Sequence, residues 1–178
     1  LTPDTTRASQ FGYPIGYDQL TIVKNPAYRG PQGTGHNYSQ LNYSVFGSAT
    51  APIFYVTNAQ TKLLLAEASQ RGWLTGLSNV LTTKEYYETG VIASMDEYSL
   101  YPNVPSPAVP AALKSSYLEN PLVKFSEAKA LELINTQYWI ASLGNGAESF
   151  ANFRRSGFPA LSPNNYNNNL QGGFTRRF

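Results

Sequence analysis

Side chains that could act as nucleophiles, general bases or metal ligands are few in this sequence of 178 residues. It contains no cysteine, which excludes a thiolate nucleophile, a thiolate metal site and a disulfide within these residues. His36 is the only histidine, so the sequence offers one candidate imidazole base and no histidine cluster for a metal. Because His36 lies in the glycine-rich run 30–36, we expect its ring to be hydrogen-bonded within a loop. We predict no cofactor and no metal site.

The eleven acidic residues offer no convincing pair of catalytic carboxylates. Glycoside hydrolysis needs two carboxyl groups that face each other across a cleft, whereas the neighbours Asp96 and Glu97 would point about 100° apart on a helix. Glu67 is different because it lies in the apolar run LLLAEAS, where a carboxylate must be paired. We predict no enzymatic activity, and we expect Glu67 to form a structural ion pair with an arginine: Arg71, Arg154 or Arg155.

Tyrosine is the residue type that suggests binding. The chain has 13 tyrosines, while charged residues make up only 13% of it, about half of the usual ~25%. Aromatic rings, hydroxyls and amides suit neutral ligands, because the rings stack and the polar groups form hydrogen bonds. The candidate platforms near the N-terminus are Tyr13, Tyr17, Tyr28, Tyr38 and Tyr43.

Other partners receive little support from the sequence. A net charge of +2 without a basic run gives no footprint for nucleic acid. The run 30–35 lacks the Gly-Lys-Ser/Thr ending of a phosphate-binding loop. No apolar run approaches the ~20 residues that a membrane-spanning helix needs. Because the chain starts at Leu1 without a methionine, we expect it to be a piece of a longer protein.

Residues 1–55 predict a loop-rich segment. They are rich in Gly, Pro, Tyr, Asn and Ser, and apolar runs such as 20–23 are too short for a regular helix. A segment of this length either packs across neighbouring helices or forms a binding surface.

A first helix is predicted over residues 58–71. Thr57 and Gln60 match the capping-box pattern, in which each side chain bonds the backbone of the other residue at the start of a helix. The apolar spacing predicts a buried face with Leu64, Leu65 and Ala68.

Gly72 is expected to end this helix, and Trp73 is expected to pack back onto its last turn as part of the core. A second helix is predicted from about residue 83 to 99, antiparallel to the first. Gly90 in its middle costs about 1 kcal/mol relative to alanine, so we expect the two helices to approach closely there.

A proline-rich connector at 101–110 and a short helix at 111–118 separate this hairpin from another. The next helix is expected to begin after Ser126 as its N-cap and to run to about Leu143. Its apolar stripe contains Leu131, Ile134, Tyr138 and Ala141.

The Gly-Asn-Gly link at 144–146 predicts a turn into a shorter helix that carries Arg154 and Arg155 in its last turn. Gly157 and Pro159 are expected to stop that helix.

These patterns predict a mainly α fold of tetratricopeptide-like helical hairpins with long irregular loops. The hairpins occupy residues 56–161. The asparagine-rich residues 162–178 are expected to form a loop tail.

Three blocks of sequence carry a resemblance to a known family. They are LLLAEASQRGW at 63–73, YYETGVIASMDEY at 86–98 and INTQYWIASLGNGAESFANFRRSGFPAL at 134–161. In this order they resemble the C-terminal half of the SusD/RagB family of outer-membrane nutrient-binding lipoproteins, in particular its SusD-like branch. Tyr138 stands where the family has lysine, and Asn152 where it has aspartate. The resemblance covers about residues 55–161, and its structural motif residues are Glu67, Arg71, Trp73, Arg154, Arg155, Gly157 and Pro159.

The resemblance implies that residues 1–178 are the C-terminal part of a SusD-like domain. Such proteins are anchored to the outer membrane on the cell-surface side through a lipidated cysteine, which would lie outside this chain. They cap a SusC-type TonB-dependent transporter and capture glycans, or peptides in some members, without catalysing a reaction. The N-terminal half of the same protein is therefore a further expected partner. The expected contacts to ligand or transporter are Tyr13, Tyr17, Tyr28, His36 and Tyr38.

Two other classes stay open. A helical-repeat interaction module would bind a partner peptide in a groove between helix pairs, but it leaves the tyrosine-rich loops unexplained. A secreted glycoside hydrolase would require a paired acid cleft.

Overall fold

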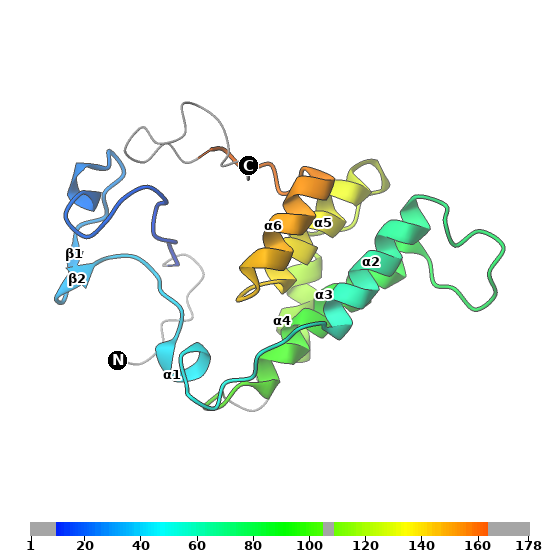
Figure 1. The fold of residues 1–178 in the computed structure, drawn as a ribbon, viewed down its shortest axis with the longest axis horizontal. Coiled ribbons are helices and arrows are strands. Elements are labelled where there is room, and N and C mark those ends of the chain that lie inside the picture. The colour runs from blue at the N-terminus through cyan, green and yellow to red at the C-terminus, as the bar shows by residue number, and fades with distance from the viewer. Residues whose placement is uncertain (1–9, 105–108, 164–178) are drawn as a thin grey trace. The chain divides into compact units, whose positions relative to one another are not determined.

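The computed structural model describes residues 10–104 and 109–163 (Figure 1). These residues form two compact units, each of which makes most of its contacts within itself. The smaller unit contains residues 10–43 and 161–163, and the helical unit contains residues 44–104 and 109–160. None of the helices within the described ranges combines the length and the apolar character needed to cross a bilayer. In chain order the elements are η2 (Ile22–Lys24), β1 (Pro31–Gln32), β2 (Gly35–His36), α1 (Tyr43–Phe46), α2 (Asn58–Gln70), α3 (Thr83–Glu97), η3 (Tyr98–Leu100), α4 (Ala111–Leu118), η4 (Glu127–Lys129), α5 (Ala130–Ala141) and α6 (Gly146–Ser156).

The smaller unit is built on a short antiparallel hairpin. Strands β1 and β2 pair Pro31 with His36 and Gln32 with Gly35, so the glycine-rich run is a hairpin and not a phosphate-binding loop. Gly33 lies in the connecting turn at φ +58°, a left-handed conformation that glycine adopts without a Cβ clash.

Two capping boxes define the helical hairpin α2–α3, of which the first is predicted by the sequence. Thr57 accepts a hydrogen bond from the backbone of Gln60, whose side chain bonds the backbone of Thr57 in return. Thr82 and Glu85 form the same arrangement at the start of α3. Each box satisfies backbone N–H groups that have no partner within the helix.

Gly90 confirms the predicted close approach of α2 and α3. A Cβ atom at Gly90 would lie 2.9 Å from Cγ of Leu63, closer than real Cβ contacts allow. The absence of a side chain therefore lets Leu63 fill the space between the helices.

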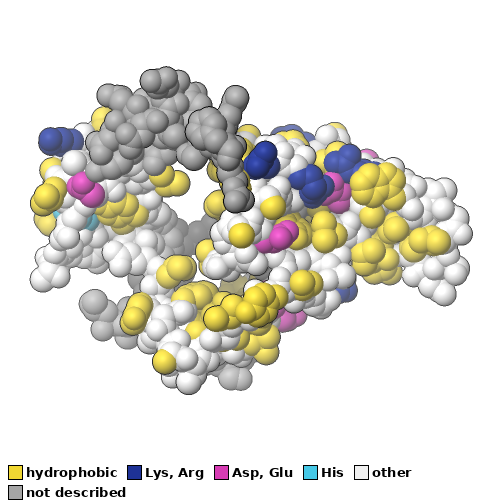
Figure 2. Space-filling view, viewed as in Figure 1, with side chains coloured by type: hydrophobic (Ala, Val, Ile, Leu, Met, Phe, Trp, Pro, Cys, Tyr) yellow, Lys and Arg dark blue, Asp and Glu magenta, His cyan; other side chains and the backbone are white. Residues whose placement is uncertain are grey.

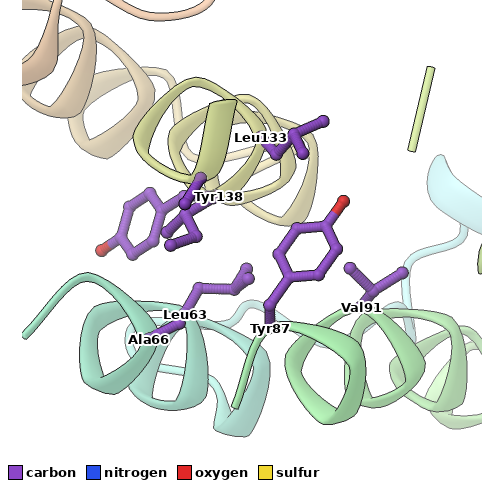
Figure 3. Close-up of a cluster of buried hydrophobic side chains, with 8 residues drawn as sticks. Leu63, Ala66, Tyr87, Val91, Leu133 and Tyr138 are labelled. Atoms are coloured by element: carbon purple, nitrogen blue, oxygen red, sulfur yellow. The ribbon is translucent and has the colours of Figure 1, made fainter. Parts of the chain in front are cut away.

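The core lies where α5 packs against the α2–α3 pair (Figure 3). Tyr87 of α3 is fully buried, and its hydroxyl donates a 2.6 Å hydrogen bond to the carbonyl oxygen of Val123. The phenol therefore contributes a large apolar ring to the core without leaving a polar group unsatisfied. The buried cluster consists of Leu63, Ala66, Tyr87, Val91, Ala130, Leu133, Ile134 and Tyr138.

Glu67 confirms the predicted ion pair and has two arginine partners. Its side chain is only 3% exposed. Arg155 of α6 donates to both carboxylate oxygens, at 2.6 Å and 2.8 Å, and Arg71 donates to one of them at 2.8 Å. These hydrogen bonds lower the pKa of Glu67, and those from Arg155 make the largest contribution. The charged form stabilises the fold above the ordinary carboxylate pKa of about 4.5, and this contribution is lost as pH falls through the lowered value.

Arg155 also connects the carboxylate to two buried asparagines. Its Nη2 atom donates to Oδ1 of Asn152 at 2.7 Å and to Oδ1 of Asn135 at 3.1 Å. One guanidinium group thus links α2, α5 and α6. Its neighbour Arg154 is exposed, and its guanidinium lies 5.7 Å from the ring centroid of Phe150.

The predicted buried face of α2 is wrong by about one residue. Leu64 is exposed, and Leu65 and Ala68 are only half-buried. The face toward α3 and α5 includes polar residues that the apolar pattern could not select. The buried residues of α2 are Ala59, Gln60, Leu63, Ala66 and Glu67.

The predicted core position of Trp73 is also wrong. Its backbone N–H closes the end of α2 on the carbonyl of Ala68, but its side chain is 68% exposed. The guanidinium of Arg71 lies 5.5 Å from its ring centroid. Figure 2 shows hydrophobic side chains on the surface at this end of the helical unit, where α2 leads into its connection with α3.

The second hairpin, α5–α6, forms at the predicted place with a different beginning. Residues after Ser126 form the 3-10 turn η4 before α5, and the Ser126 side chain makes no cap hydrogen bond. Asn145 caps α6 by accepting from the backbone N–H of Glu148, and Gly157 ends it at φ +78°. Pro159 follows Gly157 beyond the helix end, as predicted. The tail 164–178 and residues 105–108 of the proline-rich connector lie outside the described residues.

Replacing Gly90 with alanine should destabilise the helical unit by about 1–3 kcal/mol, although alanine is the better helix former, because its Cβ would overlap Leu63. Urea denaturation measures the effect. Gly146→Ala in α6 is the matched control, since no atom lies within 4 Å of its new Cβ, and it should be neutral or slightly stabilising. Equal stability of Gly90→Ala and wild type would contradict the close approach.

Replacing Arg155 with alanine should lower the free energy of unfolding by about 2–4 kcal/mol, because it leaves the buried Glu67 carboxylate with one arginine. Arg154→Ala removes the same charge from the neighbouring position and should cost less than about 1 kcal/mol. Denaturation of both variants at neutral pH provides the comparison. Similar losses for the two would show that charge alone, and not the pairing with Glu67, explains the effect.

Candidate functional site

The smaller unit contains an open pocket of about 500 Å³. Three of the five predicted contact residues line it: Tyr13, Tyr17 and His36. The rest of its lining is polar or small and consists of Asp18, Gln19, Thr34, Gly35 and Gln40. The hairpin β1–β2 supplies residues 34–36, and the loop before η2 supplies residues 13–19.

His36 is held by hydrogen bonds on both ring nitrogens. Nε2 lies 2.9 Å from the carbonyl oxygen of Gln19, which can only accept, so Nε2 carries the hydrogen. Nδ1 lies 2.8 Å from the Tyr28 hydroxyl, from which it accepts in the tautomer that carries its hydrogen on Nε2. The prediction that His36 is hydrogen-bonded is confirmed, but the residue lies in strand β2 and not in a loop. With both nitrogens occupied, His36 contributes the ring surface and not a free polar atom to the pocket.

Asp18 shapes the pocket wall through its own turn. Its Oδ1 atom accepts from the backbone N–H of Leu20 and Thr21 and from the Thr21 hydroxyl, at 2.9, 2.7 and 2.8 Å. The following residue Ile22 is fully buried, and its N–H bonds the Asp18 carbonyl. The turn therefore fixes the Gln19 carbonyl that holds His36.

The ring of Tyr13 packs against the ring of Tyr38. The rings of Tyr13 and Tyr38 meet edge to face, with centroids 5.2 Å apart. Burial, with the nearby charge of Asp18, raises the pKa of the Tyr13 phenol, so it is neutral at physiological pH. The hydroxyl oxygen of Tyr38 is buried and, among the described residues, has no hydrogen-bond partner.

The predicted residues thus divide into two groups. Tyr13, Tyr17 and His36 face the pocket, whereas Tyr28 and Tyr38 contact these residues and do not line it. Sequence reasoning missed the polar lining residues Gln19, Thr34 and Gln40, because it selected candidates by aromatic and imidazole side chains and these residues carry neither.

The chemistry available in the pocket is that of binding. Its lining includes a single carboxylate, Asp18, so within the described residues no second acid faces it for glycoside hydrolysis. The described residues also contain no group of three or more histidine or acidic side chains that could hold a metal ion. Phenol rings and side-chain amides remain, and these suit a neutral, hydroxyl-rich ligand.

Two tyrosine-to-phenylalanine substitutions, each of which removes one hydroxyl group, test this arrangement. Tyr28→Phe removes the hydrogen bond to His36 and should destabilise the smaller unit by about 1 kcal/mol. Tyr38→Phe removes a buried hydroxyl that makes no hydrogen bond and should be neutral or stabilising by up to about 1 kcal/mol. Thermal and urea denaturation of the pair measure the difference. The reverse order of stabilities would contradict the assignment.

The comparisons with known proteins agree on one family. A family model described as "SusD-like_2: Starch-binding associating with outer membrane" matches residues 11–178. No curated protein matches the chain.

Solved structures similar to the chain include three SusD-type or glycan-binding proteins. A SusD-like protein of Bacteroidetes AC2a is 33% identical with a TM-score of 0.53, over 60% of this chain and 20% of its own. A chitin-binding protein is 30% identical with a TM-score of 0.65, over 78% of this chain and 29% of its own. A SusD homolog from Bacteroides uniformis is 25% identical with a TM-score of 0.52, over 79% of this chain and 31% of its own.

The chain therefore spans between a fifth and a third of the length of these solved relatives. The mainly α fold and the resemblance expected from three sequence blocks are confirmed by a family match that extends from the loop-rich segment to the last residue. The chain belongs to the SusD-like family, whose members are described as starch-binding and associated with the outer membrane.

Proposed function

We propose that this chain supplies a glycan-binding site to a cell-surface nutrient-binding protein of the outer membrane. The protein captures oligosaccharides and delivers them to a SusC-type TonB-dependent transporter without catalysing a reaction. A lipidated cysteine outside residues 1–178 anchors it, and residues 1–178 form the C-terminal part of its SusD-like domain.

The observation that supports this proposal is the pocket lining, in which aromatic rings and uncharged polar side chains accompany a single carboxylate. Tyr17 offers a ring on which the apolar face of a sugar stacks, and the side-chain amides of Gln19 and Gln40 offer donors and acceptors for its hydroxyls. A pocket of about 500 Å³ is in the range of small-molecule sites. Its size suits one or two sugar rings of a longer chain.

The descriptions of the family and of one similar structure support the ligand class. The family is described as starch-binding, and one similar structure is a chitin-binding protein. Starch and chitin are both neutral glucose-type polymers, so either chemistry is compatible with a pocket that uses stacking and amide hydrogen bonds.

Isothermal titration calorimetry of the full polypeptide with starch oligosaccharides and chitin oligosaccharides tests the proposal. Tyr17→Ala should weaken binding of the preferred oligosaccharide by about 1–2 kcal/mol, which is roughly five- to thirtyfold, because it removes the stacking surface. Gln40→Ala should weaken it less. Neither substitution removes a hydrogen bond that holds the fold, so the unfolding temperature should not change.

Tyr43→Ala is the matched control, since Tyr43 is 82% exposed and does not line the pocket. It should leave affinity unchanged. Equal affinity of wild type and Tyr17→Ala for every glycan that binds would remove the pocket from the site. Binding of peptides in place of glycans would assign the protein to the peptide-capturing members of the family.

A further inference from the structure

The α2–α3 loop, residues 71–82, exposes a group of apolar side chains. Figure 1 shows the loop extending beyond the ends of its two helices, and Figure 2 shows hydrophobic side chains on the surface at this end of the helical unit. Isolated exposed apolar residues are ordinary, but a group of them at one tip marks a contact with another surface. The exposed apolar residues of the loop are Trp73, Leu77, Val80 and Leu81, at 68%, 59%, 41% and 40%.

The loop is held by its own hydrogen bonds and not by the core. The backbone N–H of Leu77 donates to the carbonyl of Leu74 at 3.2 Å, and the Thr75 hydroxyl donates to the carbonyl of Gly72 at 2.8 Å. None of the exposed apolar side chains belongs to the core cluster found among the described residues. The packing of the helical unit therefore does not explain why these residues are apolar.

The charges in and beside the loop suit an anionic partner. Arg71 begins the loop and Lys84 follows it in the first turn of α3, while the sequence between Glu67 and Glu85 contains no acidic residue. Both of these carboxylates are already used, because Glu67 is paired with arginines and Glu85 caps α3. Lys84 lies 3.6 Å from the exposed Glu88, an ion pair of little energetic weight. An anionic surface can therefore approach the loop without meeting a carboxylate within it.

We propose that the α2–α3 loop contacts a lipid bilayer whose head groups carry anionic phosphate. Trp73 and the aliphatic side chains enter the interfacial layer, while Arg71 and Lys84 stay among the phosphate groups. Tryptophan suits this layer because its ring is apolar and its indole N–H finds polar partners there. The guanidinium of Arg71 lies 5.5 Å from the ring centroid of Trp73, so the two side chains reach the same part of the interface.

The family description makes a bilayer an available partner, because it associates these proteins with the outer membrane. The contact goes beyond the lipid anchor proposed above, which does not require any of residues 1–178 to touch lipid. Because a single lipid chain can give only reversible binding, a second contact strengthens attachment to the membrane.

A protein partner fits the loop less well. A standard protein interface uses about 20–30 residues on each side and depends on a matching shape. The loop is a short projection whose exposed apolar residues all lie between positions 73 and 81. A fluid bilayer interface adapts to such a projection and needs no matching shape.

Vesicle flotation of the full polypeptide, produced without its lipid anchor, tests the proposal. It should bind vesicles of phosphatidylethanolamine and phosphatidylglycerol. Trp73→Ser combined with Leu77→Ser removes the two most exposed apolar side chains of the loop and should lower the partition coefficient about tenfold or more. Ile53→Ser combined with Tyr55→Ser is the matched control, since these side chains are 80% and 83% exposed elsewhere on the helical unit. The control pair should bind like wild type.

Lys84→Gln tests the electrostatic part of the contact. It should weaken binding to the vesicles that contain phosphatidylglycerol by about fivefold at low salt, and leave binding to vesicles of phosphatidylcholine alone unchanged. Equal losses on both kinds of vesicle would contradict a contact between Lys84 and anionic head groups.

An environment-sensitive fluorophore on Ser78→Cys reports whether the loop itself enters the bilayer, since Ser78 is exposed among the apolar residues of the loop. Its emission should rise and shift to the blue when the anionic vesicles are added. The same label on Ala147→Cys, at an exposed position of α6, should not respond.

Three results would overturn the proposal. They are the absence of binding to any of these vesicles, equal binding of wild type and the Trp73→Ser, Leu77→Ser variant, and blue-shifted emission of the Ser78→Cys label before vesicles are added, which would show that protein covers the loop. Glycan affinity, measured by calorimetry, should be the same in wild type and in this loop variant. The failure of either proposal is therefore visible independently of the other.

Discussion

A buried carboxylate is the constraint on which the helical unit depends. Glu67 lies among apolar neighbours on α2, where the free energy cost of burying a charge without partners would be prohibitive. Arg71 pairs with it from the end of α2, and Arg155 reaches it from α6, which connects the last turn of α6 to α2. Asn135 and Asn152 then accept from the same guanidinium, which explains why two amides are buried between α5 and α6. One charge thus sets the relative placement of three helices.

Sequence reasoning succeeded where a local rule or a burial penalty leaves one solution. The capping box at Thr57 is determined by residues three positions apart, and Gly90 in a helix requires a close neighbour. The pairing of Glu67 followed from the cost of burying a charge, although the choice among three arginines did not. The last turn of α6 decides it, because it brings Arg155 within hydrogen-bond distance of Glu67 while Arg154 lies near the ring of Phe150.

Sequence reasoning failed where the burial of a residue depends on which other segments pack against it. The run of leucines in α2 is apolar in several directions, so periodicity could not show that Gln60 and Glu67 belong to the buried face. The backbone N–H of Trp73 bonds the carbonyl of Ala68 at the end of α2, as expected after a glycine that ends a helix. Its ring, however, is not buried by the described residues. Of the five residues predicted as contacts, Tyr13, Tyr17 and His36 line the pocket. Tyr28 instead hydrogen-bonds Nδ1 of His36, a contact that the sequence pattern does not show.

The low charge content of the chain is also found in the lining of the pocket. Asp18 is the only carboxylate in the lining, and its Oδ1 atom already accepts three hydrogen bonds within its own turn. Both nitrogens of His36 are likewise occupied. Phenol rings and side-chain amides thus share the lining with one carboxylate. An anionic ligand would lose its hydration and meet the Asp18 carboxylate without a cationic partner in this lining, whereas hydroxyl groups require only hydrogen-bonding groups. For the glycan-binding role proposed above, the lining therefore disfavours anionic ligands.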